Sequence, residues 1–132
     1  MGLQFATESI QKLVNYTEDK EVVLDVENMP KRFSFLGNRP EELEDFTNKT
    51  GCGITIDLGH ANTCDNPEAF TNIPNIQYYH LNDNNEEKDQ HLSLGEGTLD
   101  LNLLKKVDNG IIELNNYNNV LKSKKVIEDI IG

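Results

Sequence analysis

The spacing of apolar residues predicts that strands and helices alternate along the chain. Ala6, Ile10 and Val14 recur at helical intervals, so the sequence predicts a first helix over residues 1–18. Four later runs are rich in β-branched and aromatic residues, which is typical of strands. These runs are residues 21–27, 53–58, 75–81 and 110–114.

Helical patterns fill the segments between these strands. Asn38 precedes a proline and two glutamates, which indicates a helix start capped by Asn38, and Gly51 indicates the end of that helix. A loop or short helix is expected near residues 67–70. Asp100 is expected to cap another helix, and residues 120–131 have the spacing of a last amphipathic helix.

Strand and helix thus alternate four times after the first helix. This order requires parallel strands joined by crossover helices, because the chain must return over one face of the sheet before each new strand. The length of 132 residues suits a single domain spanning residues 1–132. We therefore predict an α/β fold of four βα units preceded by one helix.

Composition narrows the possible functions. Twelve basic and 23 acidic residues give a formal net charge of −11, which argues against binding to duplex DNA through phosphate neutralisation. No apolar run approaches the roughly 18 residues of a membrane helix, and the N-terminus lacks the pattern of a signal peptide. We therefore expect a cytoplasmic protein with no membrane partner.

Four ionisable residues stand at the ends of the predicted strands. They are Glu27, Asp57, His80 and Glu113. Along the second strand, Asp57 alternates with the apolar Ile56 and Leu58, so the acid lies on the face opposite to the helices. In the third strand, adjacent Tyr78 and Tyr79 leave the assignment of faces open. The carboxyl ends of parallel strands meet at one edge, where α/β sheets place their sites.

Three further candidates lie just beyond the strand ends. His60 follows the second strand across Gly59, and this glycine is expected to turn the chain so that the histidine meets the strand-end acid. Asp89 and His91 lie two residues apart in the polar stretch 82–97, which has the composition of a long loop. Both would point to one side if the loop is extended there. Carboxylates and imidazoles form the ligand set of Zn²⁺, Mn²⁺ and Fe²⁺.

Each of these residues also has a simpler interpretation. A single aspartate at a strand end is more often a helix cap or turn residue, and a single exposed histidine usually has no special role. Their joint placement favours a metal site, because an acid or a histidine closes each of four strands and no histidine is used elsewhere. The residue pattern alone leaves both interpretations open.

Four motifs follow one another along the chain. They are Val26-Glu27-Asn28-Met29-Pro30, Asp57-Leu58-Gly59-His60-Ala61, His80-Leu81-Asn82-Asp83 and Asp89-Gln90-His91-Leu92-Ser93-Leu94-Gly95-Glu96-Gly97. Their order and spacing resemble the xylose isomerase-like TIM-barrel superfamily, which contains sugar isomerases and epimerases and also endonuclease IV. The resemblance implies a divalent-metal site at the C-terminal mouth of a (β/α)₈ barrel.

The resemblance also implies a role for each candidate. The metal, Mn²⁺ or Zn²⁺, would be held by Glu27, Asp57, His80 and Glu113. In epimerase-like members the two glutamates also act as acid and base, and His60 contacts the substrate. In endonuclease IV-like members His60, Asp89 and His91 join a multi-zinc cluster. Two further histidine ligands of the family lie in its N-terminal half and have no counterpart here.

The resemblance covers only the C-terminal half of such a barrel. A TIM barrel takes about 200–250 residues and eight strands, whereas this chain has 132 residues and four predicted strands. A half-barrel has two unpaired strand edges, and such edges invite pairing. We therefore expect either a homo-oligomer that forms a pseudo-barrel or a partner chain that supplies the complementary half. A truncated product is the alternative.

Three functions remain open on these grounds. The first is a sugar or sugar phosphate isomerase or epimerase, in which two glutamates move a proton next to a carbonyl through a metal-stabilised enediolate. The second is zinc-dependent phosphodiester cleavage at abasic DNA, which Asp89 and His91 favour. The net charge and the Met29-Pro30 sequence argue against this nucleic-acid partner. The third is a non-catalytic metal-binding half-barrel or a truncated remnant.

Overall fold

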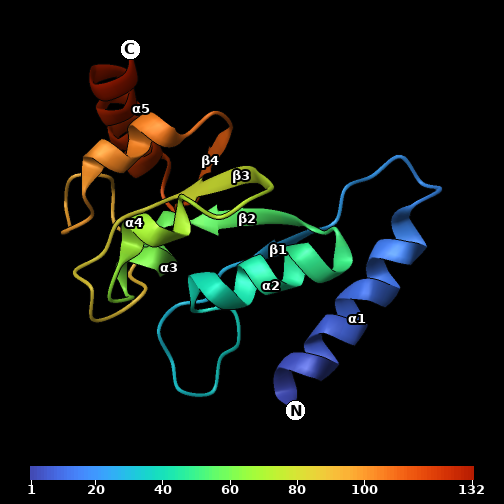
Figure 1. Cartoon of the computed structure of the whole chain (residues 1–132). Coiled ribbons are helices and arrows are strands. Elements are labelled where there is room, and N and C mark those ends of the chain that lie inside the picture. Colours follow the sequence, from blue (N-terminus) through green and yellow to red (C-terminus); the bar gives the residue numbers. More distant parts are fainter.

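One sheet of four parallel strands forms the centre of the computed structural model, which describes residues 1–132 (Figure 1). Neighbours in the sheet are also neighbours in sequence, so each crossover returns the chain to the next position. The strands are β1 (Asp25–Glu27), β2 (Gly53–Asp57), β3 (Ile76–Leu81) and β4 (Gly110–Ile112). This arrangement confirms the predicted α/β half-barrel.

Six helical segments accompany the sheet. They are α1 (Gly2–Thr17), α2 (Pro40–Thr50), α3 (Leu58–Asn62), α4 (Pro67–Phe70), the 3₁₀ helix η1 (Leu101–Lys106) and α5 (Tyr117–Ile131). The first helix thus precedes the four βα units, as predicted. None of these helices is both long enough and apolar enough to cross a membrane.

The helix ends follow the local sequence with two differences. Arg39 rather than Asn38 directly precedes α2, because Pro40 occupies the first helical position, where its missing N–H costs nothing. Gly51 ends α2 in the left-handed conformation with a φ of 74°, as its position predicted. Asp100 caps its helix through a hydrogen bond from the Asn102 N–H, although that helix is 3₁₀ rather than α.

The strand ends also differ slightly from the prediction. Glu27 and Asp57 are the last residues of β1 and β2. His80 is the last but one residue of β3, and Glu113 follows the end of β4. Leu58, predicted as the last strand residue, is the first residue of α3.

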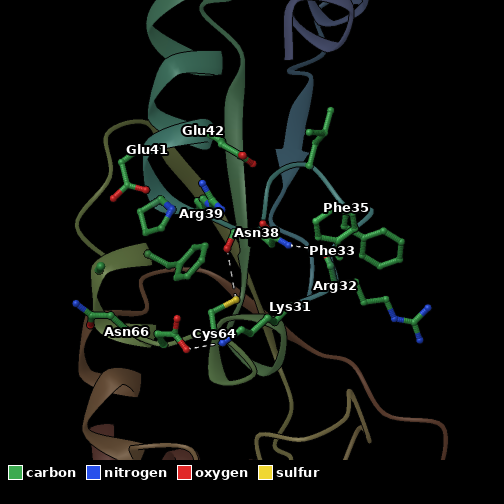
Figure 2. A pocket seen from close by; sticks show the side chains of 15 residues that line it. Lys31, Arg32, Phe33, Phe35, Asn38, Arg39, Glu41, Glu42, Cys64 and Asn66 are labelled. Carbon is green, nitrogen blue, oxygen red and sulfur yellow. Dashed lines mark hydrogen bonds and ion pairs between the residues drawn. The ribbon is translucent and has the colours of Figure 1, made fainter. Parts of the chain in front are cut away.

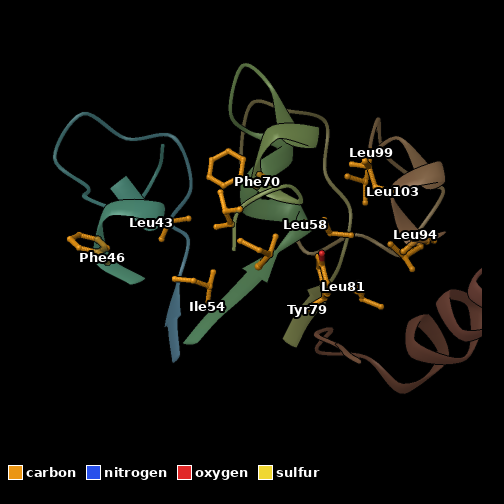
Figure 3. Close-up of a cluster of buried hydrophobic side chains, with 14 of the residues drawn as sticks. Leu43, Phe46, Ile54, Leu58, Phe70, Tyr79, Leu81, Leu94, Leu99 and Leu103 are labelled. Carbon is orange, nitrogen blue, oxygen red and sulfur yellow. The ribbon is translucent and has the colours of Figure 1, made fainter. Parts of the chain in front are cut away.

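The hydrophobic core lies between the helices and one face of the sheet (Figure 3). Ile54 and Ile56 of β2 are fully buried there, and Tyr79 of β3 points to the same side. Helices α2, α4 and η1 contribute Leu43, Phe46, Phe70, Leu103 and Leu104. The sequence left the orientation of β3 open, and the buried Tyr79 settles it, because Tyr78 and His80 must then point to the opposite face.

The opposite face of the sheet is open. Its side chains form two rows across the strands, because paired residues in a parallel sheet point the same way. The rows are Glu27–Thr55–Tyr78 and Asp57–His80–Ile111. Tyr78 is 46% exposed and Ile111 is 54% exposed. In a closed barrel this face would be the packed interior.

Candidate metal centre

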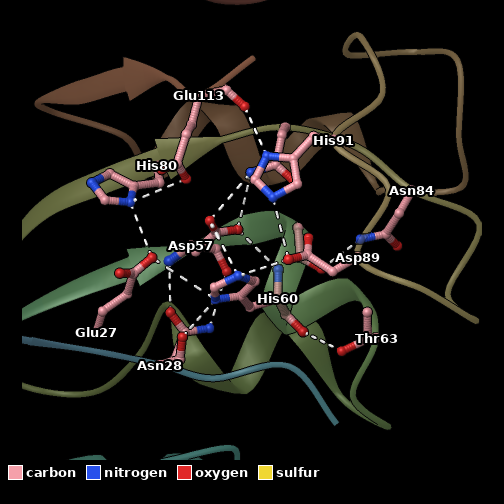
Figure 4. A network of polar contacts seen from close by, with 12 residues as sticks. Glu27, Asn28, Asp57, His60, Thr63, His80, Asn84, Asp89, His91 and Glu113 are labelled. Atoms are coloured by element: carbon pink, nitrogen blue, oxygen red, sulfur yellow. Dashed lines mark hydrogen bonds and ion pairs between the residues drawn. The ribbon is translucent and has the colours of Figure 1, made fainter. Parts of the chain in front are cut away.

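Four side chains meet at the carboxyl ends of the strands (Figure 4). The residues are Glu27, Asp57, His80 and Glu113, and one oxygen or nitrogen of each lies within 4.8 Å of the others. His80 Nδ1 is 3.0 Å from Glu27 Oε1 and 3.5 Å from Glu113 Oε2. The structure therefore brings together all four residues that the strand ends singled out.

Asp57 has the most constrained position in this group. It is fully buried, and its carboxylate accepts hydrogen bonds from the His60 backbone N–H at 2.9 Å and from the Asn82 amide, whose nitrogen is 3.2 Å from each oxygen. Asn28 joins β1 to β2, because its side chain donates to the Asp57 carbonyl and accepts from the Asp57 N–H. Asp57 thus has one fixed orientation.

The turn between Asp57 and His60 has a different cause from the one predicted. Asp57 caps α3, and the start of this helix brings the His60 backbone under the carboxylate. Gly59 does not adopt a left-handed conformation. It is required for another reason, since a Cβ at this position would collide with the Asn82 side chain.

A second group of three ligand-type side chains lies beside the first. Asp89 Oδ2 is 3.1 Å from His60 Nε2 and 3.2 Å from His91 Nε2. The Nδ1 atoms of His60 and His91 face the backbone carbonyls of Asn28 at 2.7 Å and Glu113 at 3.0 Å. Because a carbonyl only accepts, each Nδ1 donates its proton to that carbonyl, and each Nε2 is left facing Asp89 Oδ2.

The sequence analysis placed Asp89 and His91 on one side only if the chain there is extended. The two side chains do face each other, but the backbone at His91 is not extended. His91 has a φ of 53°, in the left-handed region that a residue with a Cβ rarely adopts. This turn directs its ring towards Asp89 Oδ2 while Nδ1 reaches the Glu113 carbonyl. Backbone strain of this kind persists where surrounding contacts enforce it.

The donor set fits a divalent cation. The ion pairs of Glu27, Asp57, Asp89 and Glu113 are all with histidines, and no lysine or arginine neutralises these carboxylates. Asp89 Oδ1 is buried without a hydrogen-bond partner. Carboxylates that cluster around a buried one repel one another unless a proton or a cation lies between them. Oxygen and imidazole ligands together suit Zn²⁺, Mn²⁺ or Fe²⁺.

Two titrating groups reflect this environment. Burial raises the pKa of Asp57 to about 6, although the nearby His60 partly offsets the effect. Burial alone would lower the pKa of His91, but the Glu113 carbonyl and the Asp89 carboxylate outweigh burial and raise it. Both shifts favour the protonated forms when no cation is bound, so protons and metal would compete for this site.

Asp83 organises the loop that holds the second group, a role that the sequence did not reveal. Its carboxylate is fully buried and accepts four backbone N–H groups, from Asn84, Gly95, Gly97 and Leu99, at 2.8 to 3.0 Å. A Cβ at Gly97 would collide with the Asn84 carbonyl. The Gly95-Glu96-Gly97 turn thus folds around a carboxylate. The signal was present in the sequence, since Asp83 and this turn belong to two of the recognised motifs.

Two hollows lie beside the loop after β1. One has a volume of about 570 Å³ and is lined in part by His60, Asp89, Arg32 and Lys88, so it gives a small molecule access to the second group. The other, of about 620 Å³, lies between the loop after β1 and α4 and contains none of the seven candidate residues (Figure 2).

Comparison with known proteins decides the family. The family model described as xylose isomerase-like TIM barrel matches residues 2–125. The chain belongs to this family. A solved structure, the crystal structure of a D-tagatose 3-epimerase-like protein, matches with a TM-score of 0.87 and 33% identity over 98% of this chain. The resemblance seen in the four motifs is therefore confirmed.

The relatives are about twice as long as this chain. Uncharacterized protein MJ1311 of Methanocaldococcus jannaschii is 34% identical over 93% of this chain, and Uncharacterized protein MJ1614 of the same organism is 35% identical over 80%. The present chain spans 47% of MJ1311, 42% of MJ1614 and 54% of the epimerase-like structure. The matched region corresponds to four of the eight strands of a TIM barrel.

The Asp83 network predicts a strong effect of a near-isosteric change. In Asp83→Asn, one acceptor oxygen becomes an NH₂ group, and in either orientation of the amide this group faces two backbone N–H donors. We expect the free energy of unfolding to fall by about 2–4 kcal/mol, because buried donors lose a charged acceptor. Urea unfolding measures the change. The exposed Asp129→Asn is the matched control and should differ from wild type by less than about 0.5 kcal/mol; equal values for the two variants would contradict this account.

The raised pKa of Asp57 predicts a dependence of stability on pH in metal-free protein. An unfolded aspartate loses its proton near pH 3.8, whereas folded Asp57 keeps it to about pH 6. Between these values the folded state binds more protons, so the free energy of unfolding falls as the pH rises, by roughly 3 kcal/mol from this group. Denaturant titrations with chelator at several pH values measure the drop. Asp57→Asn should remove this part of it, and an identical drop in both proteins would refute the assignment.

Proposed function

We propose that this chain is a divalent-metal-dependent sugar isomerase or epimerase-like protein that moves a proton next to a carbonyl. The main support is the convergence of Glu27 and Glu113 on the His80 ring above the buried Asp57. The family and the epimerase-like neighbour support the same class. The proposed substrate is a small sugar or sugar phosphate.

Glu27, Asp57, His80 and Glu113 would hold the metal, Mn²⁺ or Zn²⁺. When bound, the metal would polarise the substrate carbonyl and stabilise the negative charge of an enediolate. Asp57 is fully buried, so it can serve the metal but cannot contact a substrate. Asn82 and the His60 N–H fix its carboxylate in one orientation.

The two glutamates are suited to exchange protons with a substrate. Their side chains are 37% and 47% exposed, so both can reach a ligand at the mouth. Glu27 comes from the first strand of the sheet and Glu113 follows the last, and this separation of their backbones supports a scheme in which they approach the reacting carbon from two sides. One would remove the proton next to the carbonyl, and the other would return a proton from the other side.

His60 has the geometry of a substrate ligand in this scheme. Its Nδ1 donates to the Asn28 carbonyl, which fixes the ring, and its Nε2 lies at the hollow shared with Asp89. The hollow is large enough for a small sugar or sugar phosphate. His60 lines this hollow and its Nδ1 is 3.8 Å from Glu27 Oε1, so His60 would position a substrate hydroxyl near Glu27.

A second function, zinc-dependent phosphodiester cleavage, is favoured by one observation. His60, Asp89 and His91 form a separate ligand group whose three donor atoms also lie within 4.8 Å of one another. Such a group could hold a further zinc ion. The net charge of −11 disfavours nucleic acid as a partner.

The proposed role of Glu113 predicts the loss of proton exchange in Glu113→Gln. With Mn²⁺ and a ketose such as D-tagatose in D₂O, wild type should incorporate deuterium next to the carbonyl, as followed by proton NMR. Gln keeps the size of the side chain but cannot accept the proton, so the exchange rate should fall at least about 100-fold.

Glu96→Gln serves as the matched control, because Glu96 is an exposed acid in the loop away from the four ligands. Its exchange rate should equal that of wild type. Exchange retained in Glu113→Gln would eliminate Glu113 as acid or base. Failure of wild type to exchange protons of any ketose or ketose phosphate would contradict the proposed reaction.

Metal content separates the two functions. Elemental analysis and titration calorimetry should find one Mn²⁺ or Zn²⁺ ion per chain, and Asp57→Asn should weaken its binding at least about tenfold. His91→Ala should leave that ion in place. Additional zinc ions that His91→Ala abolishes would favour the phosphodiesterase, and no bound metal would contradict both functions.

A further inference from the structure

Two loops of opposite charge line the hollow of about 570 Å³ beside the candidate metal centre. The loop after β1 contributes two bases, Lys31 and Arg32, and no acid. The loop after β3 contributes three acids and one base, which are Glu86, Glu87, Asp89 and Lys88. His60 lines the hollow as well, so a molecule that fills it also reaches the ligand-type side chains.

Arg32 is the base of the first loop whose charge is not already compensated. Lys31 forms an ion pair with Asp65, which does not line this hollow, whereas the structure pairs Arg32 with no acid. The guanidinium carbon of Arg32 lies 5.3 Å from the centre of the Phe35 ring, which also lines the hollow. Arg32 therefore offers its hydrogen-bond donors to a ligand at this side of the hollow.

The backbone around Arg32 is held by hydrogen bonds within the loop. The Arg32 carbonyl accepts from the Asn38 side-chain amide at 2.9 Å and from the Phe35 backbone N–H at 3.1 Å (Figure 2). The Met29 N–H donates to the Gly37 carbonyl at 2.9 Å and closes the neck of the loop. A compact surface loop whose ends are joined in this way is a common carrier of binding residues.

A phosphorylated sugar matches this distribution of charge. Its hydroxyl groups can donate hydrogen bonds to the carboxylates of the loop after β3, and its phosphate can accept two hydrogen bonds from the planar guanidinium of Arg32. A neutral sugar would use only the first kind of contact. A positively charged ligand would be repelled by Arg32 and Lys31.

We infer that the substrate is a sugar that carries a phosphate group, and that Arg32 binds this phosphate while the carbonyl end of the molecule lies at the metal centre. The inference rests on the proposed proton transfer and adds the substrate class to it. The reaction itself is compatible with free and phosphorylated sugars alike, so Arg32 would determine specificity. Lys31 adds positive charge to the same side, although its ion pair with Asp65 limits its part.

A matched pair of ketoses measures this specificity. With Mn²⁺ in D₂O, kcat/KM for proton exchange should be at least about 100-fold higher for D-tagatose 6-phosphate than for D-tagatose, because only the former uses charge-assisted hydrogen bonds from Arg32. Arg32→Ala should reduce this ratio at least about tenfold. Arg39→Ala is the matched control and should keep the wild-type ratio, since Arg39 is exposed and lines only the other hollow.

Circular dichroism checks that both arginine variants keep the wild-type fold. Equal exchange on the two ketoses, or a ratio that Arg32→Ala leaves unchanged, would overturn phosphate recognition and leave the proposed reaction standing. If neither ketose exchanges protons, titration calorimetry with D-tagatose 6-phosphate tests the phosphate site by itself. Binding that Arg32→Ala weakens at least about tenfold and Arg39→Ala does not would support the site, and no binding would overturn it.

Discussion

The buried carboxylate of Asp57 is the constraint on which the mouth of this half-barrel depends. It ends β2, caps α3 and accepts hydrogen bonds from Asn82, so one residue links a strand, a helix and the chain after β3. A negative charge in this position is costly unless a cation or a proton compensates it. The nearby His60 offsets part of that cost, whereas Glu27 and Asp89 add to it.

Neutral groups orient several of the ligand-type side chains. Asn28 and Asn82 use neutral amides to fix Asp57, and backbone carbonyls fix the Nδ1 atoms of two histidines. Both carboxylate oxygens of Asp83, by contrast, accept hydrogen bonds from backbone N–H groups, so Asp83 is unavailable to a metal. Asp83 and Asp89 thus have different roles, because both oxygens of Asp83 are occupied in this way, whereas Asp89 Oδ1 has no hydrogen-bond partner.

The sequence predicted those features that depend on local pattern. The alternation of strands and helices indicated parallel strands, the strand patterns placed Glu27 and Asp57 at strand ends, and Gly51 indicated where α2 stops. It did not predict α3, because five residues after Asp57 are too few to show helical periodicity. Nor did it predict that Gly59 accommodates Asn82, or that Asp83 binds a turn more than ten residues away. These contacts join segments distant in sequence, and periodicity carries no information about them.

The left-handed backbone at His91 has a consequence for how this protein tolerates change. A glycine there would relieve the conformational cost of a side chain at a φ of 53°, yet it would delete the imidazole that faces Asp89. At His91, stability therefore favours glycine, whereas the geometry of the ligand group requires the imidazole. Engineering for heat resistance that placed a glycine at this position would gain stability by removing part of a binding group.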